Sequence, residues 1–354
     1  MTTLPPTMKA WTVQSNGAPS ASTLALTTQP TPAPPTGSNI LLKVTHAALN
    51  PVDLHLLNVL PTWLPFRRVA TPGLDFAGSV LAVGPGVPAD SPLAVPGTRV
   101  AGSLGVAQIA LGTGSLAEYL VVPAALVALQ PAGITASAAA GLMGVAGQTA
   151  TLMLREAGVK SGMRVLVNGA SGGVGSLVVQ VAQAKGAVVV AVCSGANEGM
   201  VRGLGAEEVV DYTAREPVEE YLAERFAVEP FDFIFDTAGS QAIYRRSPAY
   251  LKKEGKFISI VGGKSQGVVP FVRNKLLPVF LGGTPRPFRL LGLAPNGDSA
   301  KEVAKWVNEG LLKQAPIDQE YAMEDVVQAL EKLASKRAKG KIVVRVAGDA
   351  GDAA

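Results

Sequence analysis

Residues 168–175 read Asn-Gly-Ala-Ser-Gly-Gly-Val-Gly, and this stretch decides how the chain is interpreted. The apolar run before it, residues 164–167, is typical of a buried strand. Residues 176–185 after it are typical of a helix that ends at Gly186. The spacing G-x-x-G-x-x-G is a variant of the pattern in which glycines let the backbone turn sharply and approach a pyrophosphate. Strand, turn and helix start together predict a dinucleotide site, with these expected contacts: Gly169, Ala170, Ser171, Gly172, Gly173, Val174 and Gly175.

The next expected strand, residues 187–193, bears on the choice of cofactor. Sites that prefer NAD usually carry a carboxylate at the end of this strand, where it binds the ribose 2′-hydroxyl. Here Cys193 and Ser194 hold that place, and the first carboxylate is Glu198. A small hydroxyl leaves room for a 2′-phosphate, and Arg202 supplies a cation further on. The sequence therefore favours NADPH over NADH, although Ser194 is also a candidate cap for a helix that starts near Asn197.

Strands and helix-length segments continue to alternate after this point. Residues 208–211, 231–236 and 256–261 are expected strands, which predicts a doubly wound parallel sheet. Ligands of such sheets bind beyond the carboxyl ends of the strands. The residues at those ends are therefore candidate cofactor neighbours, or else simple turns: Thr237, Ala238, Gly239, Val261, Gly262 and Gly263.

Composition excludes several classes of protein. At 354 residues, 48% apolar and 16% charged, the chain is long enough for about two domains and apolar enough for a large core. A net charge of +4 without a recognisable motif predicts no nucleic-acid partner. The single cysteine fits a reducing compartment, so we expect a cytoplasmic protein. The uncharged stretch 119–154 is broken by prolines and glycines, and residues 1–7 do not resemble a signal peptide, so no membrane partner is expected.

The first part of the chain has a different pattern. Short strand-like runs at 39–44, 78–83, 98–101 and 117–122 alternate with turn signals, which predicts an all-β barrel or sandwich. Two helical segments and a final strand, residues 341–346, follow the parallel sheet. We expect that last strand to return to the β domain.

Several short stretches now indicate a family. They include Ala48-Leu49-Asn50-Pro51-Val52-Asp53, Pro72-Gly73-Leu74-Asp75-Phe76-Ala77-Gly78, Gly97-Thr98-Arg99-Val100, Asp236-Thr237-Ala238-Gly239 and Gly340-Lys341-Ile342-Val343. With the glycine turn, they make the chain resemble the medium-chain dehydrogenase/reductase superfamily, in its zinc-independent quinone oxidoreductase and enoyl reductase branch. The resemblance implies an α/β protein. A GroES-like β-barrel domain (1–135 and 298–354) would flank a Rossmann doubly wound parallel-sheet domain (136–297), with the active site between them.

The resemblance also bears on metal binding. Zinc-dependent relatives bind a catalytic zinc through cysteine, histidine and an acidic residue, and such a site needs three protein ligands. In this chain Asn50 matches the first ligand position, and Gly73-Leu74-Asp75 matches the Gly-His-Glu place. The only histidines are His46 and His55. We therefore expect no metal, and His55 is either a polar lining residue or a surface histidine.

Further site residues are implied by the resemblance. Asn50 would donate to the developing substrate oxygen, Asp53 would fix its loop, and Thr149 would lie near the nicotinamide unless its hydroxyl is bonded locally. Tyr212 matches a tyrosine that contacts the 2′-phosphate, whereas Asn197 stands where relatives carry a lysine. The remaining expected cofactor contacts are Ser194, Asn197, Arg202, Tyr212 and Lys341.

These residues predict NADPH-dependent hydride transfer, without a metal, to a small-molecule acceptor. The acceptor would be an activated C=C (enone, alkenal or enoyl) or a quinone. One alternative is a trans-acting enoyl reductase of a biosynthetic polyketide pathway. Another is a non-catalytic NADPH-binding protein with a structural or regulatory role. The resemblance also implies a possible homodimer through edge strands of the Rossmann sheet, for which the apolar segment 289–293 is the candidate strand.

Overall fold

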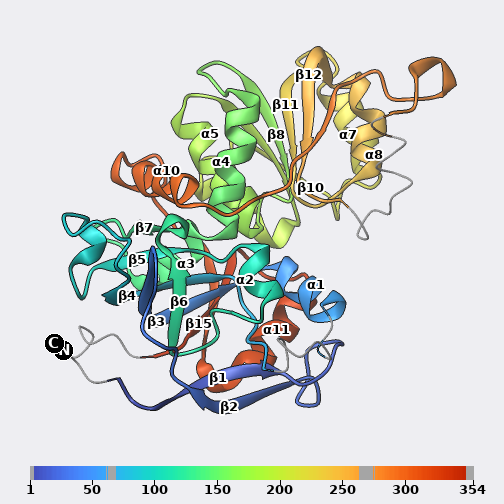
Figure 1. The fold of residues 1–354 in the computed structure, drawn as a ribbon. Coiled ribbons are helices and arrows are strands. Elements are labelled where there is room, and N and C mark those ends of the chain that lie inside the picture. The colour runs from blue at the N-terminus through green and yellow to red at the C-terminus, as the bar shows by residue number, and fades with distance from the viewer. Residues whose placement is uncertain (1–3, 61, 63–68, 263–273, 275, 348–354) are drawn as a thin grey trace. The chain divides into compact units, whose positions relative to one another are not determined.

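The computed structural model describes residues 4–60, 62, 69–262, 274 and 276–347 (Figure 1). The chain folds as two compact units. Unit 1 comprises Met1–Gln148, Ala294–Asn308 and Ala315–Ala354, and unit 2 comprises Thr149–Leu293 and Glu309–Gln314. The first junction lies inside helix α4 (Val145–Ala157), later than the 135/136 boundary expected from the sequence. The second lies at Ala294, a few residues before the expected 297/298 boundary.

Unit 2 contains a six-stranded parallel sheet with the strand order β10-β9-β8-β11-β12-β13. This is the order of the Rossmann dinucleotide-binding fold, so the predicted doubly wound sheet is confirmed. Its strands are β8 (Arg164–Asn168), β9 (Val188–Cys193), β10 (Glu208–Asp211), β11 (Phe231–Asp236), β12 (Leu251–Ser259) and β13 (Phe288–Leu290).

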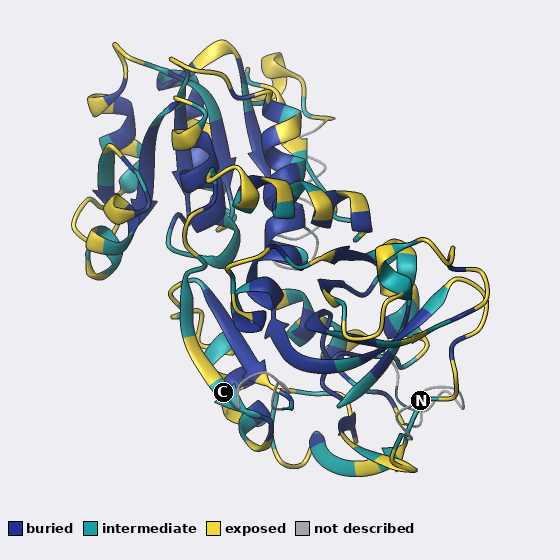
Figure 2. Cartoon of the chain, turned by 90° about the vertical axis from the view of Figure 1, so that its left-hand side faces the viewer, coloured by how far each residue is buried: buried dark blue, intermediate teal, exposed yellow. Residues whose placement is uncertain are grey.

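The strands of unit 2 form its core because helices cover the sheet. Those helices are α4, α5 (Gly173–Ala184), α6 (Glu198–Gly203), α7 (Val218–Arg225) and α8 (Gln241–Arg246). A parallel sheet covered on both faces needs nearly continuous apolar strands, and β8 and β9 are buried over most of their length. Figure 2 shows that the strands of the chain are mostly buried. Val165, Val167 and Val189 are fully buried. Strand β12 begins at Leu251, earlier than the predicted start at 256. Lys252, Lys253 and Glu254 are polar and exposed, so the sequence pattern did not indicate a strand there.

Unit 1 is the β unit. Its main sheet has the order β14-β15-β3-β4-β5-β7, with β6 paired to β3, and β1 and β2 form a separate two-stranded sheet. The strands are β1 (Thr7–Val13), β2 (Leu24–Pro30), β3 (Asn39–Leu49), β4 (Asp75–Val83), β5 (Arg99–Ser103), β6 (Tyr119–Pro123), β7 (Val127–Leu129), β14 (Ile317–Ala322) and β15 (Lys341–Arg345). The helices are α1 (Pro51–Val59), α2 (Val106–Ala110), α3 (Ala136–Met143), α10 (Gly297–Asn308) and α11 (Val326–Ala334).

Both ends of the chain contribute to unit 1, where the blue and red segments of Figure 1 meet. Strand β15 pairs antiparallel with β3, with Ile342 opposite Leu49. The indole Nε1 of Trp11 donates a 2.7 Å hydrogen bond to the carbonyl oxygen of Met323. The predicted return of the last strand to the β domain is therefore confirmed. Within the described residues, the structure has no helix long and apolar enough to cross a membrane.

Candidate active site

The glycine turn follows β8 and leads into α5. Gly169 has φ +79°, and a Cβ there would approach the Thr237 hydroxyl oxygen at 2.6 Å. A Cβ on Gly175 would collide with the carbonyl oxygen of Gly169. Gly172 caps α5 and supplies no side chain to cover the first N–H groups of the helix. These N–H groups and the positive end of the helix dipole make a site suited to a pyrophosphate.

A buried carboxylate organises the adjacent loop at the topological switch point between β8 and β11. Asp236 Oδ1 accepts hydrogen bonds from Asn168 Nδ2 and from the Gly239 N–H, both at 2.8 Å. Its Oδ2 accepts from the Ser259 hydroxyl at 3.0 Å. Burial raises the pKa of Asp236, and these hydrogen bonds oppose the shift. Asp236 and Asn168 therefore hold the carboxyl ends of three neighbouring strands together.

Of the residues expected beyond these strand ends, Thr237 and Ala238 lie beside the glycine turn. Thr237 donates from its hydroxyl to the carbonyl oxygen of Asn168 at 2.8 Å, which ties the loop containing Ala238 and Gly239 to the turn. Val261 donates its N–H to the Ser259 hydroxyl at 3.2 Å, and Gly262 follows it. Gly263 lies outside the described residues.

The end of β9 presents hydroxyl and amide groups. Ser194 precedes a short 3₁₀ turn (Gly195–Asn197), and its side chain makes no capping hydrogen bond there. The capping role considered for Ser194 is thus not seen. Asn197 Nδ2 donates to the hydroxyl oxygen of Ser171 at 3.0 Å, so this loop is linked to the glycine turn. The sequence did not indicate that link, because the two residues belong to different strand–helix connections.

Charged residues flank the same region. Arg202 lies on α6, where its Nε pairs with Glu198 Oε1 at 2.8 Å and its Nη1 donates to the carbonyl oxygen of Glu207 at 3.1 Å. Tyr212, directly after β10, is 46% exposed. Hydrogen bonds from Thr213 hold the pKa of the Asp211 carboxyl below its usual range, so Asp211 adds a negative charge beside Tyr212. Tyr212 is thus accessible, whereas Arg202 is already paired.

Unit 1 contains a cluster of four buried polar side chains, which we call the Asn50 cluster: Asn50, Asp53, Asp75 and Lys341. Each is at most 5% exposed. Lys341 Nζ donates to Asn50 Oδ1 at 2.6 Å, to Asp75 Oδ2 at 3.2 Å and to the carbonyl oxygen of Leu49 at 3.0 Å. An ammonium group has three N–H donors, and all three are used here. The structure therefore places the Lys341 ammonium in this cluster with all its donors used, and its expected contact with the cofactor stays a prediction.

Asp75 connects the Asn50 cluster to helix α4. Its Oδ2 also accepts from Asn50 Nδ2 at 2.8 Å, and its Oδ1 accepts from the Val145 N–H at the start of α4 at 2.8 Å. A carboxylate at a helix N-terminus is stabilising because it interacts with the positive end of the helix dipole. A Cβ on Gly144 would collide with this carboxyl group, so the residue before the helix has to be glycine. Thr149 lies one turn further along α4 and is buried.

Asp53 lies one turn into α1. Its Oδ2 accepts the Asn50 N–H at 2.7 Å, which fixes the start of the helix as expected for a loop-fixing role. Its Oδ1 is buried and has no hydrogen-bond partner among the described residues. Burial raises the pKa of Asp53 to about 7, and the neighbouring Asp75 carboxylate adds to the shift. A large fraction of Asp53 is therefore protonated at neutral pH.

The side chains at the positions that match zinc ligands do not suit zinc. Asn50 offers a carboxamide, Leu74 offers no donor atom, and the cation in this region is the ammonium of Lys341. Nowhere in the described part of the chain do three or more His, Cys, Asp or Glu side chains gather as a metal site would require. His55 lies exposed on α1, as in the surface interpretation.

Comparison with known proteins gives the family. Residues 36–132 match the model of the alcohol dehydrogenase GroES-like domain, and residues 204–344 match the model of the zinc-binding dehydrogenase family. The chain is 35% identical over 367 residues to the medium chain reductase pydE of an Acremonium species, covering 96% of this chain and 99% of the relative. It is 33% identical over 379 residues to the trans-enoyl reductase poxH of Penicillium oxalicum, covering 96% and 98%. The chain belongs to the medium-chain dehydrogenase/reductase superfamily.

Solved structures agree with this assignment. The quinone oxidoreductase from Coxiella burnetii superposes with a TM-score of 0.78 at 25% identity, covering 96% of this chain and all of that one. An alcohol dehydrogenase superfamily protein from Novosphingobium aromaticivorans gives a TM-score of 0.76 at 27% identity, with 96% and 100% coverage. The predicted superfamily, its zinc-independent reductase branch and the GroES-like plus Rossmann fold are confirmed. As a medium-chain reductase, the protein is an oxidoreductase that uses a nicotinamide cofactor.

Proposed function

We propose that the protein transfers hydride from NADPH to the activated C=C of an enone, alkenal or enoyl substrate, or to a quinone. The observation that carries the proposal is the Asn50 cluster. A carboxamide, that of Asn50, stands at a position where zinc-dependent relatives use a metal ligand, and the ammonium group of Lys341 is hydrogen-bonded to it. Alcohol oxidation relies on a metal to stabilise the alkoxide. A conjugated acceptor needs only a hydrogen-bond donor for its developing oxygen charge.

Asn50 is the proposed donor to that oxygen. Its amide orientation is fixed, because Oδ1 faces the Lys341 ammonium and Nδ2 faces the Asp75 carboxylate. The second Nδ2 hydrogen has only a long contact, 3.4 Å, to the carbonyl oxygen of Ala48. A hydrogen bond of that length is weak, so a substrate oxygen can replace it. In this proposal Lys341 and Asp75 hold the donor, and Thr149 lies beside the nicotinamide.

The bound cofactor supplies the hydride, and the chain binds and orients it. In the proposal, the glycine turn from Gly169 to Gly175 and the loop from Thr237 to Gly239 bind the pyrophosphate and nicotinamide portions. Ser194, Asn197 and Tyr212 surround the 2′-phosphate. The Ser194 hydroxyl, which makes no capping hydrogen bond to the following turn, and the exposed Tyr212 support NADPH over NADH.

A trans-acting enoyl reductase of a biosynthetic pathway is the second candidate. The chain matches the relative from Penicillium oxalicum, described as a trans-enoyl reductase, nearly end to end. This similarity supports an enoyl acceptor for the present protein. Such an enzyme would reduce a substrate carried by another protein. It would then prefer an enoyl thioester to a simple enone.

The test is a turnover assay that follows NADPH absorbance with a quinone, a simple enone and a 2-enoyl thioester, each repeated with NADH. We expect turnover of a C=C acceptor and a higher kcat/KM with NADPH. Asn50→Leu should lower kcat by about 10²-fold, because it removes the donor to the developing charge. Tight NADPH binding without turnover of any acceptor would contradict the proposal and favour a non-catalytic NADPH-binding protein.

A homodimer remains part of the proposal. Strand β13 is the last strand of the sheet in unit 2, and Leu291-Gly292-Leu293 follows it. An unpaired strand edge is a template for pairing with a second copy. Light scattering after size-exclusion chromatography should give twice the monomer mass. A monomer at micromolar concentration would rule the dimer out.

A further inference from the structure

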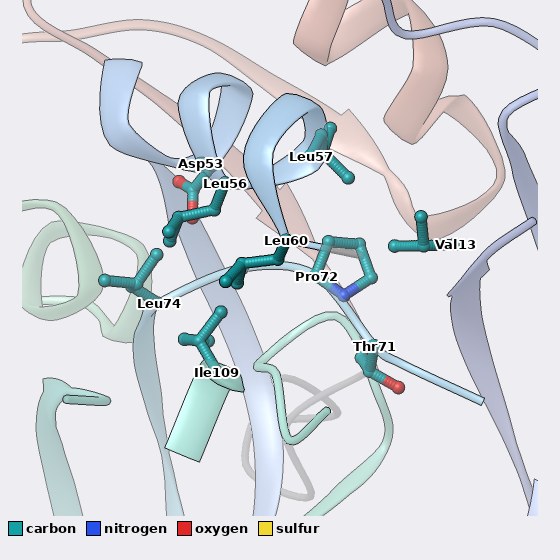
Figure 3. A pocket seen from close by; sticks show the side chains of 10 residues that line it. Val13, Asp53, Leu56, Leu57, Leu60, Thr71, Pro72, Leu74 and Ile109 are labelled. Atoms are coloured by element: carbon teal, nitrogen blue, oxygen red, sulfur yellow. The ribbon is translucent and has the colours of Figure 1, made fainter. Parts of the chain in front are cut away.

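A small cavity of unit 1 lies beside α1 and α2, with Leu56, Leu60, Leu74 and Ile109 in its wall (Figure 3). Its volume is about 20 Å³, and a single water needs roughly 10–15 Å³ on this scale. The cavity is therefore too small for a substrate or a cofactor. In unit 2, by contrast, partly exposed polar groups gather at the carboxyl ends of β9 and β10, and Asp211 connects them.

Asp211 is the last residue of β10 and lies opposite Cys193, the last residue of β9. Its Oδ1 accepts hydrogen bonds from the N–H and from the hydroxyl of Thr213, at 2.9 and 2.7 Å. A carboxylate that binds the N–H two residues later fixes the turn between them. The N–H of Tyr212, inside this turn, donates to the carbonyl oxygen of Cys193 at 3.2 Å. The backbone that carries the Tyr212 side chain is therefore fixed on both sides.

The other carboxyl oxygen of Asp211 faces the loop after β9. A Cβ on Gly195 would collide with Asp211 Oδ2, so the carboxylate lies directly against the backbone of this loop. Hydrogen bonds from Thr213, and a further one from the Gly195 N–H, hold the pKa of Asp211 below its usual range. The carboxylate is therefore ionised at neutral pH and is used to join the ends of two neighbouring strands.

The far end of the same loop is held by the glycine turn. The Asn197 N–H donates to the carbonyl oxygen of Ser194 at 2.8 Å, which closes the loop. The Asn197 Nδ2 donates to the Ser171 hydroxyl oxygen at 3.0 Å. The loop of residues 194–197 is thus fixed by Asp211 on one side and by Ser171 on the other. Such support from neighbouring residues is what a preorganised binding loop requires.

We propose that Asp211 is a positioning residue for the 2′-phosphate of NADPH, because it holds the loop of Ser194 beside the turn of Tyr212. The inference rests on the proposed function, in which Ser194, Asn197 and Tyr212 surround that phosphate. Asp211 acts through these residues and does not itself touch the phosphate, since two anions repel each other.

Gly195→Ala tests this role, because it keeps the Asp211 charge and breaks the contact. The added methyl group collides with Oδ2, so the carboxylate has to rotate away from the loop. The backbone of Gly195 is not in the left-handed region, so alanine adds no strain of its own. We expect the Kd of 2′,5′-ADP, a fragment with the 2′-phosphate, to rise about tenfold, whereas the Kd of 5′-AMP stays nearly unchanged. Isothermal titration calorimetry measures both.

Turnover gives a second readout. With Gly195→Ala, KM for NADPH should rise by a similar factor, while kcat and KM for NADH stay unchanged. A general loss of structure would lower all of these activities together. Gly199→Ala is the matched control in the same strand–helix connection, because a Cβ there meets no described atom within 4 Å. It should leave both Kd values as in the wild type.

Asp211→Ala breaks the same contact from the other side. It should also raise the Kd of 2′,5′-ADP when measured at high salt, which screens the effect of the lost charge. Because both variants remove one contact, the double variant Gly195→Ala/Asp211→Ala should bind no more weakly than Asp211→Ala alone. Fully additive losses would contradict a shared contact and overturn the role of Asp211.

Three other results would be decisive. A Gly195→Ala variant that binds 2′,5′-ADP like the wild type, or that weakens 5′-AMP equally, would overturn the role of Asp211. A wild type that binds 2′,5′-ADP no more tightly than 5′-AMP would overturn it together with the preference for NADPH, and would leave hydride transfer standing. A wild type that binds 2′,5′-ADP tightly, responds to Gly195→Ala as expected and reduces none of the acceptors would support this role but refute the proposed function.

Discussion

The ammonium of Lys341 and the carboxamide oxygen of Asn50 are 2.6 Å apart and joined by a hydrogen bond, although the residues lie at opposite ends of the chain. The same ammonium pairs with Asp75, which is fully buried. The orientation of the proposed substrate donor therefore depends on a strand contributed by the C-terminal segment.

Removing this cation should destabilise unit 1. Lys341→Met leaves the Asp75 carboxylate buried without its ion pair, which typically costs about 3–5 kcal/mol. Urea unfolding followed by tryptophan fluorescence is the measurement, because Trp11 and Trp306 are buried in unit 1. The double variant Asp75→Asn/Lys341→Met removes both charges and should recover at least half of the loss. A double variant no more stable than Lys341→Met would contradict the ion-pair explanation.

Asp53 should make stability depend on pH. Its pKa is raised from an unfolded value of about 3.9 to about 7. The folded state therefore binds more protons between these values. The stability that the protonated acid contributes is fully present below about pH 4 and is lost as pH rises through about 7. The free energy of unfolding of the wild type minus that of Asp53→Asn should fall by on the order of 4 kcal/mol between pH 4 and 8. A pH-independent difference would show that Asp53 has an ordinary pKa.

The glycine turn should not tolerate a methyl group at position 175. Gly175→Ala places a Cβ against the carbonyl oxygen of Gly169 and 2.9 Å from the Cα of Ala170, and backbone atoms cannot move aside easily. We expect NADPH binding to weaken at least about tenfold, which corresponds to about 1.4 kcal/mol. Gly203→Ala is the matched control, since a Cβ there meets no atom within 4 Å. Fluorescence titration with NADPH compares the two, and equal affinities would contradict the prediction.

The ion pair between Arg202 and Glu198 should affect the preference of the enzyme for NADPH over NADH. Glu198→Gln removes a carboxylate from the start of α6 and frees the guanidinium from its 2.8 Å partner. We expect the ratio of kcat/KM for NADPH to that for NADH to rise several-fold at low salt, and to fall with Arg202→Ala, because a 2′-phosphate is stabilised by a nearby cation. If neither variant changes the ratio, Arg202 is out of reach of the cofactor.

Much of unit 2 could be predicted from the sequence. Buried parallel strands appear as continuous apolar runs, so β8 and β9 lie within one residue of the predicted ranges 164–167 and 187–193. Partly exposed strands could not be predicted in this way. The first residues of β12 and the edge strand β14 are polar, since one face of each meets solvent, and neither pattern indicated a strand.

The candidate site was predicted only in part. The sequence indicated Asn50 and Asp53 through the family resemblance, but it did not bring Lys341 to them. That contact depends on the pairing of β15 with β3, which no local pattern contains. The link between Asn197 and Ser171 and the role of Asp236 at the ends of β8 and β11 were missed for the same reason.

The pairing of β15 with β3 also has a consequence for biosynthesis. Most of unit 2 is one continuous stretch, Thr149–Leu293, whereas unit 1 needs a strand from near the end of the chain. Domains fold as units while the chain is being synthesised, so the ribosome releases unit 2 for folding first. Until residue 341 emerges, Asp53 and Asp75 lack their cation and the sheet of unit 1 has an open edge at β3. Unit 1 can therefore mature only after β15 has left the ribosome, and until then the unpaired edge of β3 is exposed to aggregation.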